Sequence, residues 1–211
     1  SSDVCSSDLG DPLRRRPMAD LHEALRHLGA HVDAVDGAAP GHLPVRVSGG
    51  DLVGGSVAIR GDVSSQFISA LMLVGPVMRD GLRISVSGTL VSRPYVEMTA
   101  EVMRAFGAQV EIDSDHITVH PGAYHRTDYE VEPDFSSAAF AVMSLAFSPG
   151  RVRVPRLHTA MLQGDSLVLD IARTMGMTVA FDGDDVLVEV SPGTILSPVS
   201  VNLSEIGRAH V

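Results

Sequence analysis

A four-residue motif that occurs twice constrains the fold of this chain more than any other feature. Asp62-Val63-Ser64-Ser65 returns as Asp134-Phe135-Ser136-Ser137, so that residue 62 corresponds to residue 134, a separation of 72. Each copy is followed by an apolar stretch at helical spacing and then by a short alternating strand; these are residues 67–78 and 82–86, and residues 138–147 and 152–154. Self-similarity at a fixed period indicates one supersecondary unit that is used repeatedly.

The second half of each copy has the same order of elements. A second helix is predicted over residues 94–106 and 165–175, and each ends at a glycine in the position of a C-terminal cap, Gly107 or Gly176. A strand pair joined by hairpin-turn residues then follows, over 109–112 with 116–119 and over 178–181 with 185–190. With strands expected at 56–59 and 129–133 before the two motifs, the repeat is a βαβαββ unit.

A third and truncated copy opens the chain. Residues 17–28 form an amphipathic helix closed by Gly29, and strands are expected from residue 30 and at 45–47. The fold class is therefore α/β with repeated units and mixed sheets. We expect residues 9–130 to hold two units of a first domain, the first unit truncated, and residues 131–203 to hold the first unit of a second domain. The ends at 1–8 and 204–211 lack any pattern and are expected to be non-native tails.

The first motif lies at the start of an apolar helix. Asp62 is expected to be the N-cap, which places Ser64, Ser65 and Gln66 in a first turn with unpaired backbone N–H groups. Such a turn suits an anion, although capping alone also explains an aspartate and two serines. The second copy keeps the aspartate and both serines but has Ala138 where the first has Gln66. Capping therefore explains Ser136 and Ser137, whereas Gln66 indicates binding.

The composition excludes several kinds of function. The chain has 16 basic and 26 acidic residues, a net charge of −10, and every basic residue is an arginine. This balance argues against a nucleic-acid partner, the absence of lysine excludes a P-loop, and no apolar run is long enough to span a membrane. The single cysteine, Cys5, excludes an intrachain disulfide, and the nine histidines show no metal-ligand spacing. We expect a cytoplasmic protein with neither metal nor cofactor.

Several motifs in order and spacing give the chain a resemblance to a known family. They are Arg16-Pro17-Met18, Gly61 to Phe67, Ser92-Arg93-Pro94-Tyr95, Phe106-Gly107, Val131 to Asp134 and Leu162 to Asp165. The chain resembles the 3-phosphoshikimate 1-carboxyvinyltransferases, the EPSP synthases of the shikimate pathway, over about residues 10–190. The resemblance implies an inside-out α/β barrel of the enolpyruvyl transferase type, with three βαβαββ units in each of two domains. This chain is then incomplete and corresponds to roughly the middle half of an enzyme that is expected to be monomeric.

The resemblance also implies a reaction and its binding residues. The family transfers the enolpyruvyl group of phosphoenolpyruvate to the 5-hydroxyl of shikimate 3-phosphate and releases phosphate. Ser64, Ser65 and Gln66, with Ser92 and Tyr95, match the residues that hold shikimate 3-phosphate, and Arg93 is a further anion partner. Arg14 and Arg15 are candidates for contact with phosphoenolpyruvate, because the family has such an arginine close to this point; the alternative is a solvated basic helix start. The family's acid/base carboxylates and its lysines lie in segments that this chain does not contain, so the chain alone is expected to be inactive.

Two alternatives remain open. The first is the sister enolpyruvyl transferase that acts on UDP-N-acetylglucosamine, although Ser64-Ser65-Gln66-Phe67 together with Ser92-Arg93-Pro94-Tyr95 argues against it. The second is a non-catalytic module that reuses the fold to bind an anion.

Overall fold

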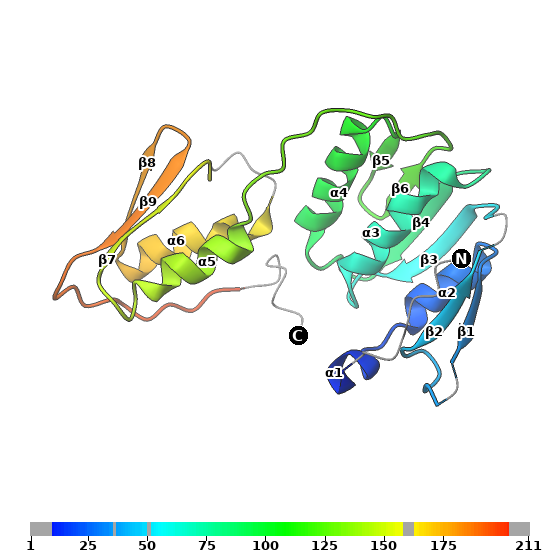
Figure 1. Ribbon diagram of the computed structural model, residues 1–211, viewed down its shortest axis with the longest axis horizontal. Coiled ribbons are helices and arrows are strands. Elements are labelled where there is room, and N and C mark those ends of the chain that lie inside the picture. Colours follow the sequence, from blue (N-terminus) through cyan, green and yellow to red (C-terminus); the bar gives the residue numbers. More distant parts are fainter. Residues whose placement is uncertain (1–9, 36, 50–51, 158–162, 203–211) are drawn as a thin grey trace. The chain divides into compact units, whose positions relative to one another are not determined.

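The computed structural model describes residues 10–35, 37–49, 52–157 and 163–202. The tails expected at 1–8 and 204–211 lie outside these ranges. The chain forms two compact units (Figure 1): residues 1–91 with 99–127, and residues 92–98 with 128–211. The division passes through helix α4 (Arg93–Ala105).

In its described residues, the first unit contains three further helices, one 3-10 turn and six strands. The helices and the turn are α1 (Asp11–Arg14), α2 (Ala19–His27), α3 (Ser65–Val74) and η2 (Gly75–Val77). The strands are β1 (His31–Ala34), β2 (Val45–Ser48), β3 (Gly55–Arg60), β4 (Leu82–Ser87), β5 (Val110–Ile112) and β6 (His116–Val119).

Strands β3 to β6 form one sheet in the order β3-β4-β6-β5. β3 and β4 are parallel and are joined by the α3 crossover, whereas β6 is antiparallel to both β4 and β5. With α3 and α4 between its strands, this segment is a complete βαβαββ unit, as the repeat predicted. Its buried residues include Phe67, Ile68 and Leu71 on α3 and Ile59 and Ile84 on the sheet.

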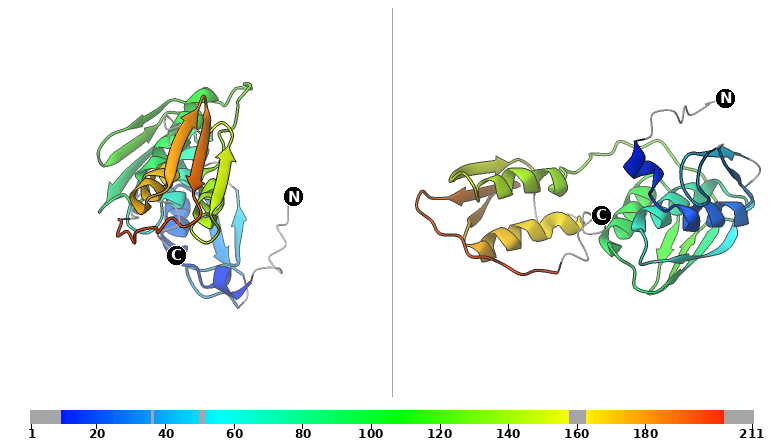
Figure 2. Two further views of the ribbon diagram at one scale, coloured as in Figure 1. Left: turned by 90° about the vertical axis from the view of Figure 1, so that its left-hand side faces the viewer. Right: turned by 90° about the horizontal axis from the view of Figure 1, so that it is seen from below.

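The second unit is a smaller copy of the same arrangement. It contains α5 (Phe135–Ser144), β7 (Gly150–Val154), η3 (Gly164–Ser166), α6 (Leu167–Met175), β8 (Thr178–Asp182) and β9 (Asp185–Val190). The sheet has the order β7-β9-β8, and α5 and α6 lie on one of its faces (Figures 1 and 2). Alternate residues of β9, which are Val186, Val188 and Val190, pack in the core beneath these helices.

The sequence predicts a strand over residues 129–133, and this prediction is wrong. These residues adopt no regular secondary structure, and Val131 is 75% exposed. The segment alternates apolar and charged side chains as a half-buried strand does. Among the described residues, however, it pairs with no other strand, and without a pairing partner the alternation buries nothing.

The three copies end their second helix in the same way. Gly29, Gly107 and Gly176 follow α2, α4 and α6 with φ of 102°, 91° and 100°, the left-handed region that glycine adopts without strain. A strand pair follows each glycine. Within the described residues, β5–β6 and β8–β9 gain a third strand, β4 or β7, whereas β1–β2 form a two-stranded sheet. Among the described residues, the copy that opens the chain thus contributes helix α2 and the two-stranded sheet β1–β2.

The prediction that Asp62 is the N-cap of α3 is also wrong. The N-cap of α3 is Ser64, whose Oγ accepts a hydrogen bond from the Gln66 backbone N–H at 3.2 Å. Asp62 turns away because Arg60 holds its carboxylate with two hydrogen bonds of 3.1 and 2.9 Å, and this hydrogen bonding lowers the pKa of Asp62. In the second copy, Asp134 does cap α5, because its carboxylate accepts from the N–H groups of Ser136 and Ser137.

The equivalent aspartates should therefore respond differently to substitution. Asp134→Ala is expected to lower the free energy of unfolding by about 1 kcal/mol, the usual contribution of an N-cap. Asp62→Ala removes only an exposed ion pair and should change it by a few tenths of a kcal/mol. Urea unfolding of both variants measures the difference, and equal losses would contradict this assignment of the two caps.

A buried histidine makes the stability of the first unit depend on pH. His22 on α2 is 3% exposed, and its Nδ1 has no hydrogen-bond partner among the described residues. Burial, assisted by the nearby Arg26 and His42, lowers the pKa of His22 below its ordinary value of 6.5. The unfolded chain therefore binds this proton at a higher pH than the folded chain does.

Stability should consequently fall on mild acidification. The contribution of neutral His22 is complete above pH 6.5 and is lost as the pH falls from 6.5 toward the lowered pKa of the folded state. Urea unfolding at pH 7.5 and pH 5.5 should show this loss in the native protein and a smaller one in His22→Leu. His31→Gln, at an exposed position on β1, serves as the control and should keep the native pH dependence.

Candidate functional site

The first candidate site is the start of α3, residues 64–66, which we call the α3 start. Ser64 is extended and caps the helix, Ser65 is largely buried at the first helical position, and the Gln66 side chain is exposed. The first turn contains no acidic residue. The positive end of a ten-residue helix thus carries two serine hydroxyls, one of them largely buried, and an exposed amide, a donor set that suits an anion.

Arg16 joins this group across a separation of 50 residues. Its Nη2 donates to Gln66 Oε1 at 2.7 Å from the linker between α1 and α2. The sequence predicts Arg14 or Arg15, and not Arg16, as the contact with phosphoenolpyruvate. Arg14 lies in the last turn of α1, and Arg15 lies 3.9 Å from Asp11 with both side chains at least 80% exposed. Contact of either one with substrate stays a prediction, and Arg16 is the arginine that sequence reasoning missed.

The signal for Arg16 was present in the sequence. Arg16-Pro17-Met18 is one of the motifs that carry the resemblance, and among the three consecutive arginines only Arg16 precedes the proline. A proline fixes its own backbone, restricts that of the residue before it and starts the approach to α2. The backbone of Arg16, which precedes the proline, is therefore more restricted than that of Arg14 or Arg15.

The second candidate site is the start of α4, residues 92–95. Ser92 has a φ of 53°, which is unusual for any residue other than glycine, and it is 2% exposed. Its Oγ has no hydrogen-bond partner among the described residues, while its carbonyl accepts from the Tyr95 N–H at 3.0 Å. A strained backbone and an unpaired buried hydroxyl on one residue both reduce stability, and such residues cluster at functional sites.

The neighbours of Ser92 offer a cation and a phenol. Arg93 Nε donates to Glu97 Oε1 at 2.8 Å, one turn along α4, with both side chains about two-fifths exposed. Burial raises the pKa of Tyr95 above its ordinary value, and its side chain already has hydrogen bonds with Ser136 and Asp165. The α4 start therefore places the hydroxyl groups of Ser92 and Tyr95 next to Arg93, whose positive charge is paired with Glu97.

Contacts within the first unit hold the segments that lead to the two sites. The Val91 N–H donates to the Gly61 carbonyl at 3.1 Å, and Ser69 and Thr99 share a hydrogen bond of 2.8 Å between α3 and α4. A Cβ on Gly61 would lie 3.0 Å from Leu90 Cα, so only glycine permits this approach. The loop before α3 therefore lies against the segment before α4. The two sets of predicted contacts belong to different compact units.

The equivalent helix start in the second copy already binds carboxylates of the protein itself. Asp134 accepts from the backbone N–H groups of Ser136 and Ser137 and from the Ser137 hydroxyl, and the Ser136 hydroxyl donates to Asp165, which is 3% exposed. These residues therefore act as a cap, as the sequence indicated. The α3 start differs because Arg60 withdraws Asp62, which leaves the helix end open to an external anion.

The described residues show neither a metal-binding cluster nor a membrane-spanning helix. They contain no group of three or more His, Cys, Asp or Glu side chains that could hold a metal ion. Over the same ranges, no helix is both long and apolar enough to cross a bilayer.

The family model and two similar relatives name the same family, and each matches most of this chain. The model of the EPSP synthase (3-phosphoshikimate 1-carboxyvinyltransferase) family matches residues 9–210. Proteins named 3-phosphoshikimate 1-carboxyvinyltransferase are 43% identical in Methanothermobacter thermautotrophicus and 37% identical in Methanosphaera stadtmanae, each over 92% of this chain. The chain spans 45% and 46% of the length of these relatives, so it is a fragment by comparison with them.

Solved structures show the same fold at lower identity. EPSP synthase from Acinetobacter baumannii superposes with a TM-score of 0.58 at 22% identity, over 85% of this chain and 40% of that one. The enolpyruvyl transferase NikO from Streptomyces tendae gives a TM-score of 0.58 at 19% identity, over 84% and 43%. The fold is therefore of the enolpyruvyl transferase type and incomplete, and from the match along the sequence the chain belongs to the EPSP synthase family.

Proposed function

We propose that the protein to which this chain belongs transfers the enolpyruvyl group of phosphoenolpyruvate to the 5-hydroxyl of shikimate 3-phosphate, and that this chain supplies substrate-binding residues for the reaction. The observation that carries the proposal is the open α3 start. Its helix end has no carboxylate of its own, and Arg16 contacts Gln66 beside it. At the start of α5, the corresponding helix in the second copy, the carboxylate of Asp134 occupies the backbone N–H groups. At the start of α3, where we propose that the phosphate binds, no carboxylate of the protein does so.

Both substrates are anions, and the two groups of residues suit different parts of them. The hydroxyls of Ser64 and Ser65 and the N–H groups of the α3 start suit the 3-phosphate of shikimate 3-phosphate. Gln66 accepts from Arg16 through Oε1, which leaves its Nε2 hydrogens for a substrate oxygen. The Arg16 guanidinium suits the carboxylate or phosphate of phosphoenolpyruvate, because it presents paired donors in a plane. Ser92, Arg93 and Tyr95 are proposed as the second contact set for shikimate 3-phosphate.

The chemistry requires groups beyond these. The 5-hydroxyl oxygen loses its proton and bonds to C2 of phosphoenolpyruvate while C3 gains a proton, and the tetrahedral intermediate then loses phosphate from C2 and a proton from C3 to form the enol ether. A general acid/base must move these protons. We propose no catalytic acid or base in this chain, which also has no lysine, and we therefore propose that the chain alone is inactive. The whole enzyme is proposed to be a cytoplasmic monomer that needs no cofactor.

An acceptor comparison tests the proposed reaction. The chain should be joined to the remaining segments of a family member and assayed for phosphate release from phosphoenolpyruvate with shikimate 3-phosphate or with UDP-N-acetylglucosamine. We expect turnover only with shikimate 3-phosphate, and none in a single-turnover reaction of the isolated chain. Turnover only with the UDP-sugar would establish the sister transferase, and binding without turnover of either acceptor would establish a non-catalytic module.

A further inference from the structure

The two copies of the Asp-x-Ser-Ser motif begin their helices at different positions. α3 begins at residue 65, three residues after Asp62, whereas α5 begins at residue 135, one residue after Asp134. Ser64 is therefore the N-cap outside α3, although its equivalent, Ser136, lies inside α5. The shared motif thus forms two kinds of helix start, and residues that differ between the copies decide which one forms.

The residue two positions before the aspartate has opposite charge in the two copies. It is Arg60 in the first copy and Glu132 in the second, again 72 residues apart. Arg60 donates from Nε and Nη2 to the carboxylate of Asp62, at 3.1 and 2.9 Å. Glu132 has the same charge as Asp134 and cannot bind it, and the Asp134 carboxylate accepts from two backbone N–H groups of its own helix. The charge at this position therefore matches the behaviour of the aspartate in each copy.

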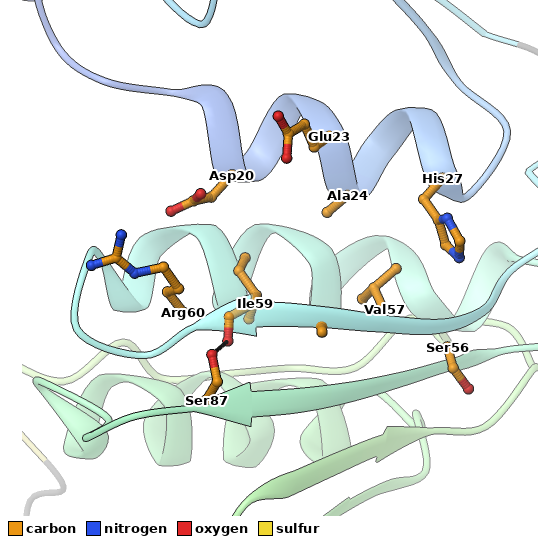
Figure 3. Close-up of a pocket in the computed structure, with 10 residues that line it drawn as sticks. Asp20, Glu23, Ala24, His27, Ser56, Val57, Ile59, Arg60 and Ser87 are labelled. Carbon is orange, nitrogen blue, oxygen red and sulfur yellow. Dashed lines mark hydrogen bonds between the residues drawn. The ribbon is translucent and has the colours of Figure 1, made fainter.

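A second carboxylate helps to hold the Arg60 side chain. Arg60 is the last residue of β3, and Asp20 in the first turn of α2 points toward it (Figure 3). The negative charge of Asp20 adds to the attraction between the guanidinium and Asp62. Arg60 is thus kept at the end of β3, where it holds Asp62 away from the first N–H groups of α3.

We propose that Arg60 is a positioning residue for shikimate 3-phosphate, because by binding Asp62 it keeps the first N–H groups of α3 available for the phosphate. This role rests on the function proposed above, which supplies the ligand. Without Arg60, Asp62 caps α3 as Asp134 caps α5, and the helix begins two residues earlier. The Asp62 carboxylate then accepts from the N–H groups of Ser64 and Ser65, the equivalents of the two that Asp134 binds, and competes with the phosphate for them.

Such a competition changes the affinity for substrate and leaves the chemical step unchanged. When the binding-competent state is only partly populated, the apparent dissociation constant rises in inverse proportion to its population. An N-cap of ordinary strength corresponds to a ratio of about five between capped and open helix starts. In the complete enzyme, loss of Arg60 should therefore raise KM for shikimate 3-phosphate about fivefold, while kcat at saturating substrate stays within about twofold.

Four variants test the role by titration calorimetry with shikimate 3-phosphate, in this chain joined to the remaining segments of a family member. Arg60→Ala should weaken binding about fivefold. Arg60→Ala/Asp62→Ala also removes the competing carboxylate and should restore the native dissociation constant to within about twofold. Arg60→Ala/Asp62→Asn should stay weak, because asparagine is uncharged but caps a helix as well as aspartate does. Arg79→Ala is the matched control, since it takes an arginine from an exposed pair with Asp80, and it should bind as the native protein does.

Hydrogen exchange without ligand tests the helix start itself. Measured by NMR, the N–H groups of Ser64 and Ser65 should exchange more slowly in Arg60→Ala than in the native protein, and at the native rate in Arg60→Ala/Asp62→Ala. If exchange slows in this way but shikimate 3-phosphate fails to bind the native enzyme, the proposed function is wrong, whereas the control of the cap by Arg60 is supported.

Two outcomes would overturn the role of Arg60. Unchanged exchange at Ser64 and Ser65 in Arg60→Ala would mean that Asp62 does not move to the cap, and it would assign the later start of α3 to the hydrogen bond between the Gly61 carbonyl and the next strand's loop. Equal restoration of binding by Asp62→Ala and Asp62→Asn in the Arg60→Ala background would mean that the phosphate responds to the charge of Asp62 and not to a cap.

Discussion

Arg16→Ala in the complete enzyme is expected to lower kcat/KM for phosphoenolpyruvate by about 10- to 100-fold, because a hydrogen bond to a charged group contributes roughly 1.5–3 kcal/mol. Gln66→Ala should cause a loss of similar size. Since the two side chains share a hydrogen bond of 2.7 Å, the double variant should lose less than the sum of the single losses. Steady-state kinetics with both substrates varied measures all three.

Arg15→Ala is the matched control for this cycle. It removes the same charge one position earlier, from a side chain that lies over an exposed turn rather than against Gln66. If Arg16 and not Arg15 contacts the substrate, Arg15→Ala should change kcat/KM by less than twofold. A large loss in Arg15→Ala with little change in Arg16→Ala would restore the assignment made from the sequence and would contradict the one made from the geometry.

Ser92 is expected to show opposite effects on stability and on binding. Ser92→Gly removes a buried hydroxyl that has no partner and relieves a φ of 53°, so the free energy of unfolding should rise by about 1–2 kcal/mol even after the entropy cost of glycine. The same change removes the hydroxyl that is proposed to donate to the substrate. KM for shikimate 3-phosphate should therefore rise up to about tenfold.

Ser92→Ala separates the two causes. It removes the hydroxyl but keeps a side chain in the left-handed backbone, so it should stabilise the protein less than Ser92→Gly while raising KM by the same factor. Urea unfolding and steady-state kinetics on the same samples provide both quantities. A loss of stability in Ser92→Ala would mean that the hydroxyl has a structural partner, and Ser92 would then lose its place in the site.

The repeat allowed most of the fold to be predicted from sequence, because its signals are local. Gly29, Gly107 and Gly176 mark helix ends through backbone freedom alone, and the hairpins follow from their turn residues. The strand predicted over 129–133 failed because pairing depends on a partner far along the chain. The cap predicted at Asp62 failed for a related reason: Arg60, two residues away, competes for the same carboxylate, which no capping preference includes.

The site was less predictable than the fold. The hypothesis for Gln66 rests on a difference between the two copies, Gln66 against Ala138, after serines that both copies share. The contact between Arg16 and Gln66 spans 50 residues and depends on how the linker before α2 folds back onto α3. The strain and unpaired hydroxyl of Ser92 are properties of its backbone and surroundings, and a serine in the sequence gives no sign of either.

The central claim is that the α3 start, and not its counterpart at α5, binds the phosphate of shikimate 3-phosphate. Titration calorimetry of shikimate 3-phosphate into the complete enzyme tests it with a matched pair of variants, Ser64→Ala/Ser65→Ala and Ser136→Ala/Ser137→Ala. The account predicts at least tenfold weaker binding in the first variant and an unchanged dissociation constant in the second, because Asp134 and Asp165 already hold the second pair of serines. Equal losses in both variants, or a loss confined to the second, would contradict it.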